Sequence, residues 1–163
     1  MVLLVGVWAW NRYGGDRDAR RIHARFDALV NTVEKTEPSS QLRILALAQQ
    51  IPEFFTSDAT ISLAPMYGGS LNRREAASYL ARIHQTLDRL TIRISDRRLE
   101  IDRANNTAQL RFTAQGNLEL GANTESQLHA FEVFWIKTDG DWHIQRASTV
   151  QSIRQPGRTG AFQ

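Results

Sequence analysis

At 163 residues the chain is long enough for one domain with a hydrophobic core, because folding at that length removes about 70% of the unfolded chain's surface from water. Hydrophobic residues make up 42% of the sequence and charged residues 23%, which excludes a wholly disordered chain and a body embedded in a membrane. The formal net charge of +3 is spread along the chain, and the basic stretch at residues 17–25 is interrupted by acidic residues, so nucleic acid is not an expected partner. The absence of cysteine excludes disulfides, thiolate metal sites and cysteine nucleophiles.

Residues 1–15 form a separate apolar segment that starts MVLLVGVWAW and ends at Gly14-Gly15, which we interpret as a hinge. Its apolar run is half the length of about 20 residues that a membrane span needs. It also lacks the basic start and small-residue cleavage site of a signal peptide. Three interpretations remain: the end of a longer membrane anchor, a short interfacial anchor using Trp8, Trp10 and Tyr13, or an apolar tail folded onto the domain. An anchor would favour a periplasmic or other extracytoplasmic location over the cytoplasm.

Three helices are expected at the start of the main domain, residues 16–155. Residues 16–35 carry apolar side chains at helical spacing, and a second helix follows the capping candidates Ser39 and Ser40. A third helix begins at Asn72, because Glu75 three residues later completes a capping-box pattern. Between the second and third helices, residues 59–64 favour a short strand.

From residue 91 the apolar pattern has a period of two, which predicts strands. Its phase changes between Ile94 and Leu99, so a β-bulge is expected near residues 96–98. Residues 108–120 alternate between apolar and polar, as in a strand with one buried face. An Asp139-Gly140 turn leads into a last strand that ends at about residue 153, and residues 156–163 read as a flexible tail.

Residues 126–138 are apolar on both faces of the strand that they predict. One face can pack against the helices of the same chain, which leaves the other uncovered. We therefore predict a homodimer formed through the sheet.

The order of elements and two sequence phrases resemble the nuclear transport factor 2-like superfamily. The phrases are FFTSDATISLAP at the first strand and WIKTDGDWHI at the closing hairpin, and the resemblance covers about residues 16–153. It implies an α+β, cystatin-like cone, in which three N-terminal helices pack on a strongly curved antiparallel sheet around an internal pocket. The superfamily includes ketosteroid isomerases, SnoaL-like polyketide cyclases, dehydratases, ligand binders and assembly domains. The resemblance therefore implies a fold without specifying a function.

The isomerases of this superfamily suggest a test for catalytic residues. Their catalytic base precedes a proline at the end of the first strand, but the matching segment here reads Ser62-Leu63-Ala64-Pro65 and contains no carboxylate. Glu132 matches their second carboxyl, which is kept protonated so that it can donate a hydrogen bond. The sequence therefore matches the second carboxyl of the isomerases but lacks their catalytic base.

The register of the last hairpin decides what Glu132 does. A two-residue loop at Asp139-Gly140 places Val133 opposite Arg146, whereas a three-residue loop places Glu132 opposite Arg146. We expect the second arrangement and a structural ion pair between Glu132 and Arg146. A pocket acid with a raised pKa and an exposed glutamate are the alternatives.

No histidine lies at metal-ligand spacing from another, and no phosphate-loop or dinucleotide motif is present, so neither a metal nor a cofactor is expected. Tyr79 and His84 on the third helix could border a pocket, although a partly buried helix histidine is commonly structural. The candidate pocket residues are therefore Tyr79, His84, Glu132 and Arg146.

The missing base and the anchor-like start favour a non-catalytic domain of the bacterial cell envelope that binds a small apolar ligand or a protein partner. One alternative is an acid–base isomerase or cyclase that uses Glu132 together with Tyr79, His84 or Arg146. Another is an assembly subunit of an envelope complex, because the periplasmic assembly component of type IV secretion systems also joins an N-terminal anchor to this fold.

Overall fold

The computed structural model describes the backbone of residues 2–150 and the side chains from residue 17 onward. Helices α1 (Val2–Val33) and α2 (Gln41–Gln50) are followed by a 3₁₀ turn, η1 (Ile51–Phe54), and α3 (Arg73–Thr86) follows two short strands. The strands are β1 (Phe55–Ser62), β2 (Ser70–Leu71), β3 (Arg89–Asp102), β4 (Thr107–Leu120), β5 (Asn123–Thr138) and β6 (Asp141–Val150). The predicted tail and the last three residues of the predicted final strand lie outside the described residues.

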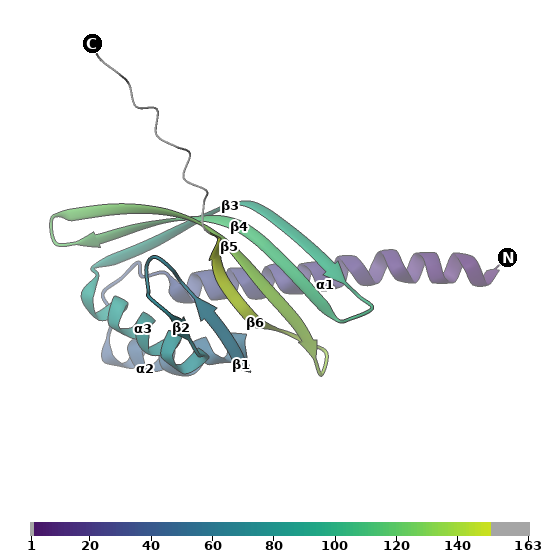
Figure 1. Ribbon diagram of the computed structural model, residues 1–163, viewed down its shortest axis with the longest axis horizontal. Coiled ribbons are helices and arrows are strands. Elements are labelled where there is room, and N and C mark those ends of the chain that lie inside the picture. The colour runs from purple at the N-terminus through teal and green to yellow at the C-terminus, as the bar shows by residue number, and fades with distance from the viewer. Residues whose placement is uncertain (1, 151–163) are drawn as a thin grey trace, which may run out of the picture.

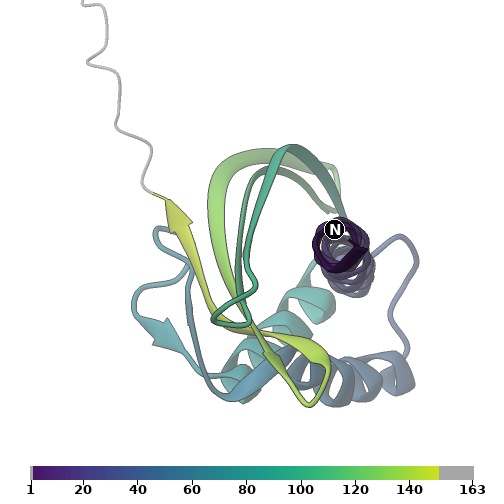
Figure 2. The same cartoon turned by 90° about the vertical axis from the view of Figure 1, so that its right-hand side faces the viewer.

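The six strands form one open sheet in the order β2-β1-β6-β5-β4-β3. Neighbouring strands are antiparallel except β1 and β6, which run parallel, so the sheet is mixed rather than purely antiparallel. Figure 2 shows the long strands arching over toward α1, and α2 and α3 pack against each other beside that helix. The predicted α+β architecture, with the helices first and a curved sheet after them, is confirmed.

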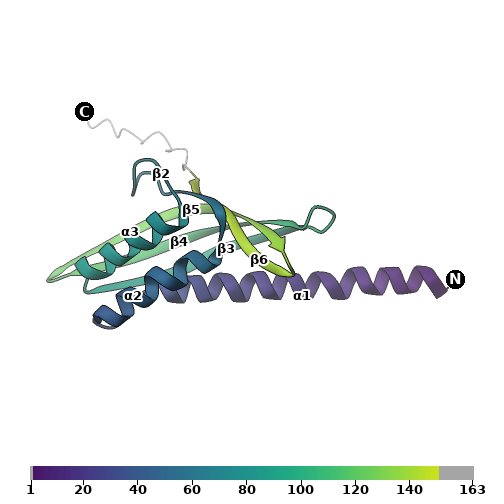
Figure 3. The same ribbon diagram turned by 90° about the horizontal axis from the view of Figure 1, so that it is seen from below.

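Helix α1 is continuous for 32 residues, a length of about 48 Å at about 1.5 Å per residue. The predicted hinge at Gly14-Gly15 is wrong, because both glycines lie inside the helix and its hydrogen-bonded turns continue through them. The C-terminal part of α1 packs beneath the sheet, whereas its N-terminal part projects beyond the rest of the domain (Figures 1 and 3). Within residues 2–150, no helix is long and apolar enough to cross a membrane.

A polar clasp holds α1 against the tip of the last hairpin. Asp18 accepts hydrogen bonds from Lys137 Nζ at 3.0 Å and Trp142 Nε1 at 3.1 Å, and Arg21 donates to the carbonyl of Gly140. Partial burial alone would raise the pKa of Asp18, but these two hydrogen bonds and the charge of Lys137 more than offset it and lower the pKa. The clasp therefore fixes the point at which α1 leaves the domain.

Two β-bulges set the shape and register of the sheet. The pairing of β3 with β4 shifts between Ser95 and Arg98, where Asp96 has a φ of 55°, so the predicted bulge is confirmed. The Asp139-Gly140 loop has two residues, both with positive φ as a type I′ turn requires. A second bulge lies between Phe134 and Trp135 in the pairing of β5 with β6, and the sequence pattern did not indicate it.

A second clasp joins the ends of α1 and α3 in the interior. The buried Lys35 ammonium donates to the carbonyls of His84 and Leu87, which are free acceptors at the C-terminus of α3. The imidazole of His84 is almost fully buried, and its Nε2 lies 2.8 Å from the carbonyl of Val33, so that nitrogen carries a proton and donates. Its Nδ1 lies 3.3 Å from the hydroxyl of Ser39, from which the neutral ring accepts. Burial lowers the pKa of His84, and the charges of Arg43 and Lys35 lower it further, against an opposing effect of the Val33 carbonyl.

This clasp predicts that the domain loses stability in mild acid. The folded pKa of His84 lies below its unfolded value of about 6.5, so the unfolded chain binds the additional proton in that interval. The stabilisation is fully present above about pH 6.5 and decreases as pH falls from there toward the folded pKa. Urea unfolding between pH 7.5 and pH 5 should show this decrease in wild type and a smaller one in His84→Gln. Equal slopes for the two proteins would contradict the prediction.

Candidate functional site

The concave face of the sheet is filled by aromatic side chains where α1 crosses it. Phe112 of β4 stacks on Phe131 of β5, with ring centroids 5.3 Å apart, and Phe26 of α1 packs on Phe112 at 4.6 Å. Phe26 and Phe112 are buried. These three rings therefore form part of the packed core.

Toward the free end of the β4–β5 hairpin the concave face is lined by small residues on β4. Ala114 lies opposite His129, and Gly116 lies opposite Gln127. A Cβ atom at Gly116 would meet only Leu118 Cδ1, at 3.9 Å, which is ordinary van der Waals contact. The side chains of β4 therefore do not fill the space beside His129 and Gln127.

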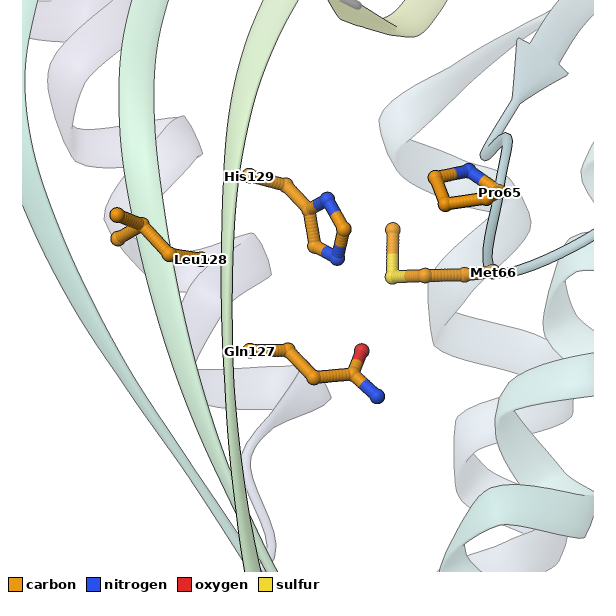
Figure 4. Close-up of a pocket in the computed structure, with 5 residues that line it drawn as sticks. All are labelled: Pro65, Met66, Gln127, Leu128 and His129. Carbon is orange, nitrogen blue, oxygen red and sulfur yellow. The ribbon is translucent and has the colours of Figure 1, made fainter. Parts of the chain in front are cut away.

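A groove of about 290 Å³ opens at this place, lined by Pro65, Met66, Gln127, Leu128 and His129. Figure 4 shows the side chains of His129 and Gln127 directed from β5 toward Met66 and Pro65, whereas Leu128 points to the opposite side of the strand. The groove therefore lies between β5 and the loop that follows β1.

The loop of Pro65 and Met66 is held from two sides. On one side the hydroxyl of Thr149 in β6 donates to the carbonyl of Ala64. On the other, the hydroxyl of Tyr79 in α3 donates to the carbonyl of Met66 at 3.4 Å, and the Tyr79 ring packs edge-on against Tyr67. One wall of the groove is thus fixed to both α3 and β6.

The groove has few polar groups. They are the imidazole of His129 and the amide of Gln127, whose Nε2 donates to Glu125 Oε1 at 2.7 Å. The ring of His129 also meets Phe131 edge-on, at 6.5 Å between centroids, so the groove borders the aromatic core. Among the side chains that the structure describes, those of residues 17–150, no cluster of three or more histidine and acidic groups could hold a metal ion.

The four predicted pocket residues do not come together. Tyr79 supports the groove loop from behind, and His84 belongs to the interior clasp with Lys35. Glu132 lies on the outer, convex face of the sheet, because it alternates with the inward-facing Val133. Arg146 lies on the same face, because the bulge pairs it with the outward-facing Phe134. The structure therefore offers a different set of groove residues from the one that the sequence predicted.

The predicted ion pair between Glu132 and Arg146 is wrong, and so is the three-residue loop on which it depended. The two-residue loop pairs Thr138 with Asp141 and would place Arg146 opposite Val133. The bulge between Phe134 and Trp135 then displaces the register by one more residue, so that Glu132 faces Ser148 and Arg146 faces Phe134. The guanidinium of Arg146 lies over the ring of Phe134 at 4.1 Å. The partner of Glu132 is Arg111 on the other neighbouring strand, at 2.7 Å.

The ion pair of Arg111 and Glu132 lies at the surface, with 58% of the Arg111 side chain and 22% of the Glu132 side chain open to solvent. Exposed pairs of this kind contribute roughly 0–1 kcal/mol to stability, less than the buried pair that the sequence suggested. Glu132 is therefore a surface residue with a nearby counter-charge, and it is separated from the groove by the thickness of the sheet.

One pattern in the sequence of β4 indicates the groove, although it was not among the predictions above. Ala114 and Gly116 continue the inward-facing positions of Leu110 and Phe112, and the fall in side-chain volume along this series indicates unfilled space. The signal does not identify Gln127 and His129, because that requires the register between β4 and β5.

Neither a protein-family model nor a curated protein matches the sequence. Solved structures match over most of the chain. A proposed scytalone dehydratase from Novosphingobium aromaticivorans is 14% identical, with a TM-score of 0.66, and the match covers 91% of this chain and 97% of that one. A nuclear transport factor 2-like protein with a cystatin-like fold, also from Novosphingobium aromaticivorans, is 16% identical with a TM-score of 0.63, over 90% of this chain and 88% of its own.

A hexachlorocyclohexane dehydrochlorinase is 15% identical with a TM-score of 0.63, and the match covers 82% of this chain and 84% of that one. These identities are too low to transfer an activity, and what the three proteins share with this chain is the arrangement of helices and sheet. The chain therefore has the nuclear transport factor 2-like fold that its sequence resembles.

Proposed function

We propose that this protein is a non-catalytic binding domain whose groove takes a small, mainly apolar molecule. The observation that carries the proposal is the groove itself, bordered by Met66 and Pro65 on one side and His129 and Gln127 on the other. Ligand sites of small domains are concave and mostly apolar, with a few polar groups that orient the ligand. A groove of about 290 Å³ suits a molecule of one or two rings.

The arrangement of titratable groups favours binding over catalysis. Proton-transfer catalysis needs an acid and a base within hydrogen-bond reach of the substrate. His129 is the one titratable side chain among the five lining residues, and the segment that ends at Pro65 carries no carboxylate. Glu132, the carboxyl that resembles the isomerases' acid, lies on the other face of the sheet.

An acid–base enzyme is the second candidate, and the direction of the His129 ring into the groove is the observation that favours it. Two proteins of similar structure are described as a dehydratase and a dehydrochlorinase, and both names denote eliminations. An imidazole in a groove can accept a proton in such a reaction. This candidate requires a second group that the substrate or a rearrangement of the groove would supply.

Filling the groove should abolish binding while leaving the fold intact. In Gly116→Leu the new side chain enters the open space beside Gln127, and the strand loses a glycine that weakens it. The neutral fluorescent probe N-phenyl-1-naphthylamine should bind wild type saturably and bind Gly116→Leu at least about tenfold more weakly. Thr113→Leu, which adds a similar side chain on the outer face of β4, is the matched control and should bind like wild type. Equal binding by all three proteins, or no binding by wild type, would reject the proposal.

We also propose a homodimer formed through the outer face of the sheet. Leu128 is 67% exposed there and lies in line with Ala130, Phe134 and Ile136 on β5. The guanidinium of Arg146 covers part of Phe134, so the apolar area is smaller than the sequence suggested. Pairing of two copies would remove this strip from water.

Sedimentation velocity at about 10 μM tests the dimer. Wild type should sediment as a dimer, and Leu128→Glu should shift it to the monomer because two added carboxylates would face each other across a symmetric interface. Leu42→Glu, which changes an exposed leucine on α2, should leave the dimer unchanged. A wild-type protein that sediments as a monomer would contradict the proposed homodimer.

The projecting part of α1 supports a tether to the bacterial cell envelope. The sequence of residues 2–10 contains no polar or charged residue, which suits a lipid environment better than the one-sided apolar pattern of a coiled coil. An assembly role in an envelope complex would use the same tether with the outer sheet face as its contact surface. Both roles place the domain outside the cytoplasm.

Flotation with phosphatidylethanolamine–phosphatidylglycerol vesicles tests the tether. Wild type should float with the vesicles, whereas a double variant with Leu4→Asp and Val7→Asp should stay in the dense fraction. Its urea unfolding should match wild type, because these positions project beyond the domain. Loss of stability in the double variant would instead show that the segment packs on the core.

A further inference from the structure

A carboxylate lies next to the groove on β5. Glu125, Gln127 and His129 occupy alternate positions on β5, so their side chains share the concave face, and Glu125 lies opposite Leu118. The amide of Gln127 donates to Glu125 Oε1 and holds that carboxylate beside the groove. Among the residues that the structure describes, Glu125 forms no ion pair.

The unused hydrogen-bonding atoms of the groove are mainly acceptors. One N–H of Gln127 Nε2 donates to Glu125 and the other remains a donor, while Figure 4 shows the acceptor Oε1 on the side of the amide that faces Met66. Glu125 adds an acceptor with a full negative charge. None of the five lining residues is a lysine or arginine, so the groove has no cation to hold an anionic ligand.

On the basis of the proposed binding function, we infer that the ligand is an organic cation, an ammonium group carried on an apolar ring or chain. The apolar body lies between Met66 and His129, and the ammonium donates to Gln127 Oε1 and the Glu125 carboxylate. Hydrogen bonds between charged partners are the stronger ones, which makes this end of the groove selective for positive charge. A carboxylate on the same apolar body would instead be repelled by Glu125.

Three probes with one ring system and different charge test this inference. 2-Naphthylmethylamine, 2-naphthylmethanol and 2-naphthoate are each titrated at pH 7.5 to displace N-phenyl-1-naphthylamine from the full-length protein. We expect the amine to bind roughly three- to fivefold more tightly than the alcohol, because Glu125 is exposed and its charge is screened by water. The naphthoate should bind most weakly.

Two carboxyl variants locate the source of the preference. Glu125→Gln should bring the affinity for the amine down to that for the alcohol, while the affinity for the alcohol stays unchanged. Glu100→Gln removes the same charge from the outer face of β3, opposite Gln109, and should keep the wild-type preference. Repeating the titrations in 1 M salt should reduce the preference in wild type and have little effect in Glu125→Gln.

The outcomes separate this inference from the function on which it rests. Displacement by all three probes with similar affinity, or a preference that survives Glu125→Gln, overturns the cationic ligand while the groove remains a binding site. Loss of the preference in Glu100→Gln as well as Glu125→Gln also overturns it, because the effect would then follow net charge. Failure of wild type to bind the reporter or any probe rejects the binding function and this inference together.

Discussion

The extent of the packed core depends on how side-chain volume changes along the inward face of β4. Phe112 fills the cone together with Phe26 and Phe131, and the next two inward positions, Ala114 and Gly116, leave space. A sheet presents alternate side chains on one face at fixed spacing, so the residue types at consecutive inward positions decide where the core ends. β5 thus borders the packed interior at one end and, together with the loop that follows β1, the groove at the other.

The two clasps fix the helices that close the cone around this strand pair. Asp18 ties α1 to the tip of the β5–β6 hairpin, and Lys35 with His84 ties the end of α1 to the end of α3. Both clasps use charged or titratable groups whose hydrogen bonds are satisfied inside the protein, which is the condition for burying them. Because α3 carries Tyr79, which supports the Met66 loop, the interior clasp also determines the position of one wall of the groove.

Local patterns in the sequence were enough to predict the elements but not the site. The capping box at Asn72, the bulge near Asp96 and the Asp139-Gly140 turn are each specified by a few adjacent residues, and the structure contains all three. The bulge opposite Phe134 has no such signal, because Gln145 and Arg146 fit a regular strand equally well. The two-residue loop moved Arg146 from Glu132 to Val133, and the extra residue of the bulge moved it on to Phe134, so the predicted ion pair does not form. Identification of the groove required pairing across three segments, the Pro65 loop, β4 and β5, which no local pattern supplies.

The most direct test of this account is to map where an apolar molecule binds. A ¹H–¹⁵N spectrum of the protein, titrated with N-phenyl-1-naphthylamine, reports contacts residue by residue. The account predicts that the shifted amides are those of Met66, residues 114–116 and residues 127–129, around the groove. Shifts confined to the outer face near Phe134 and Arg146, or to the exposed face of α2, would contradict it.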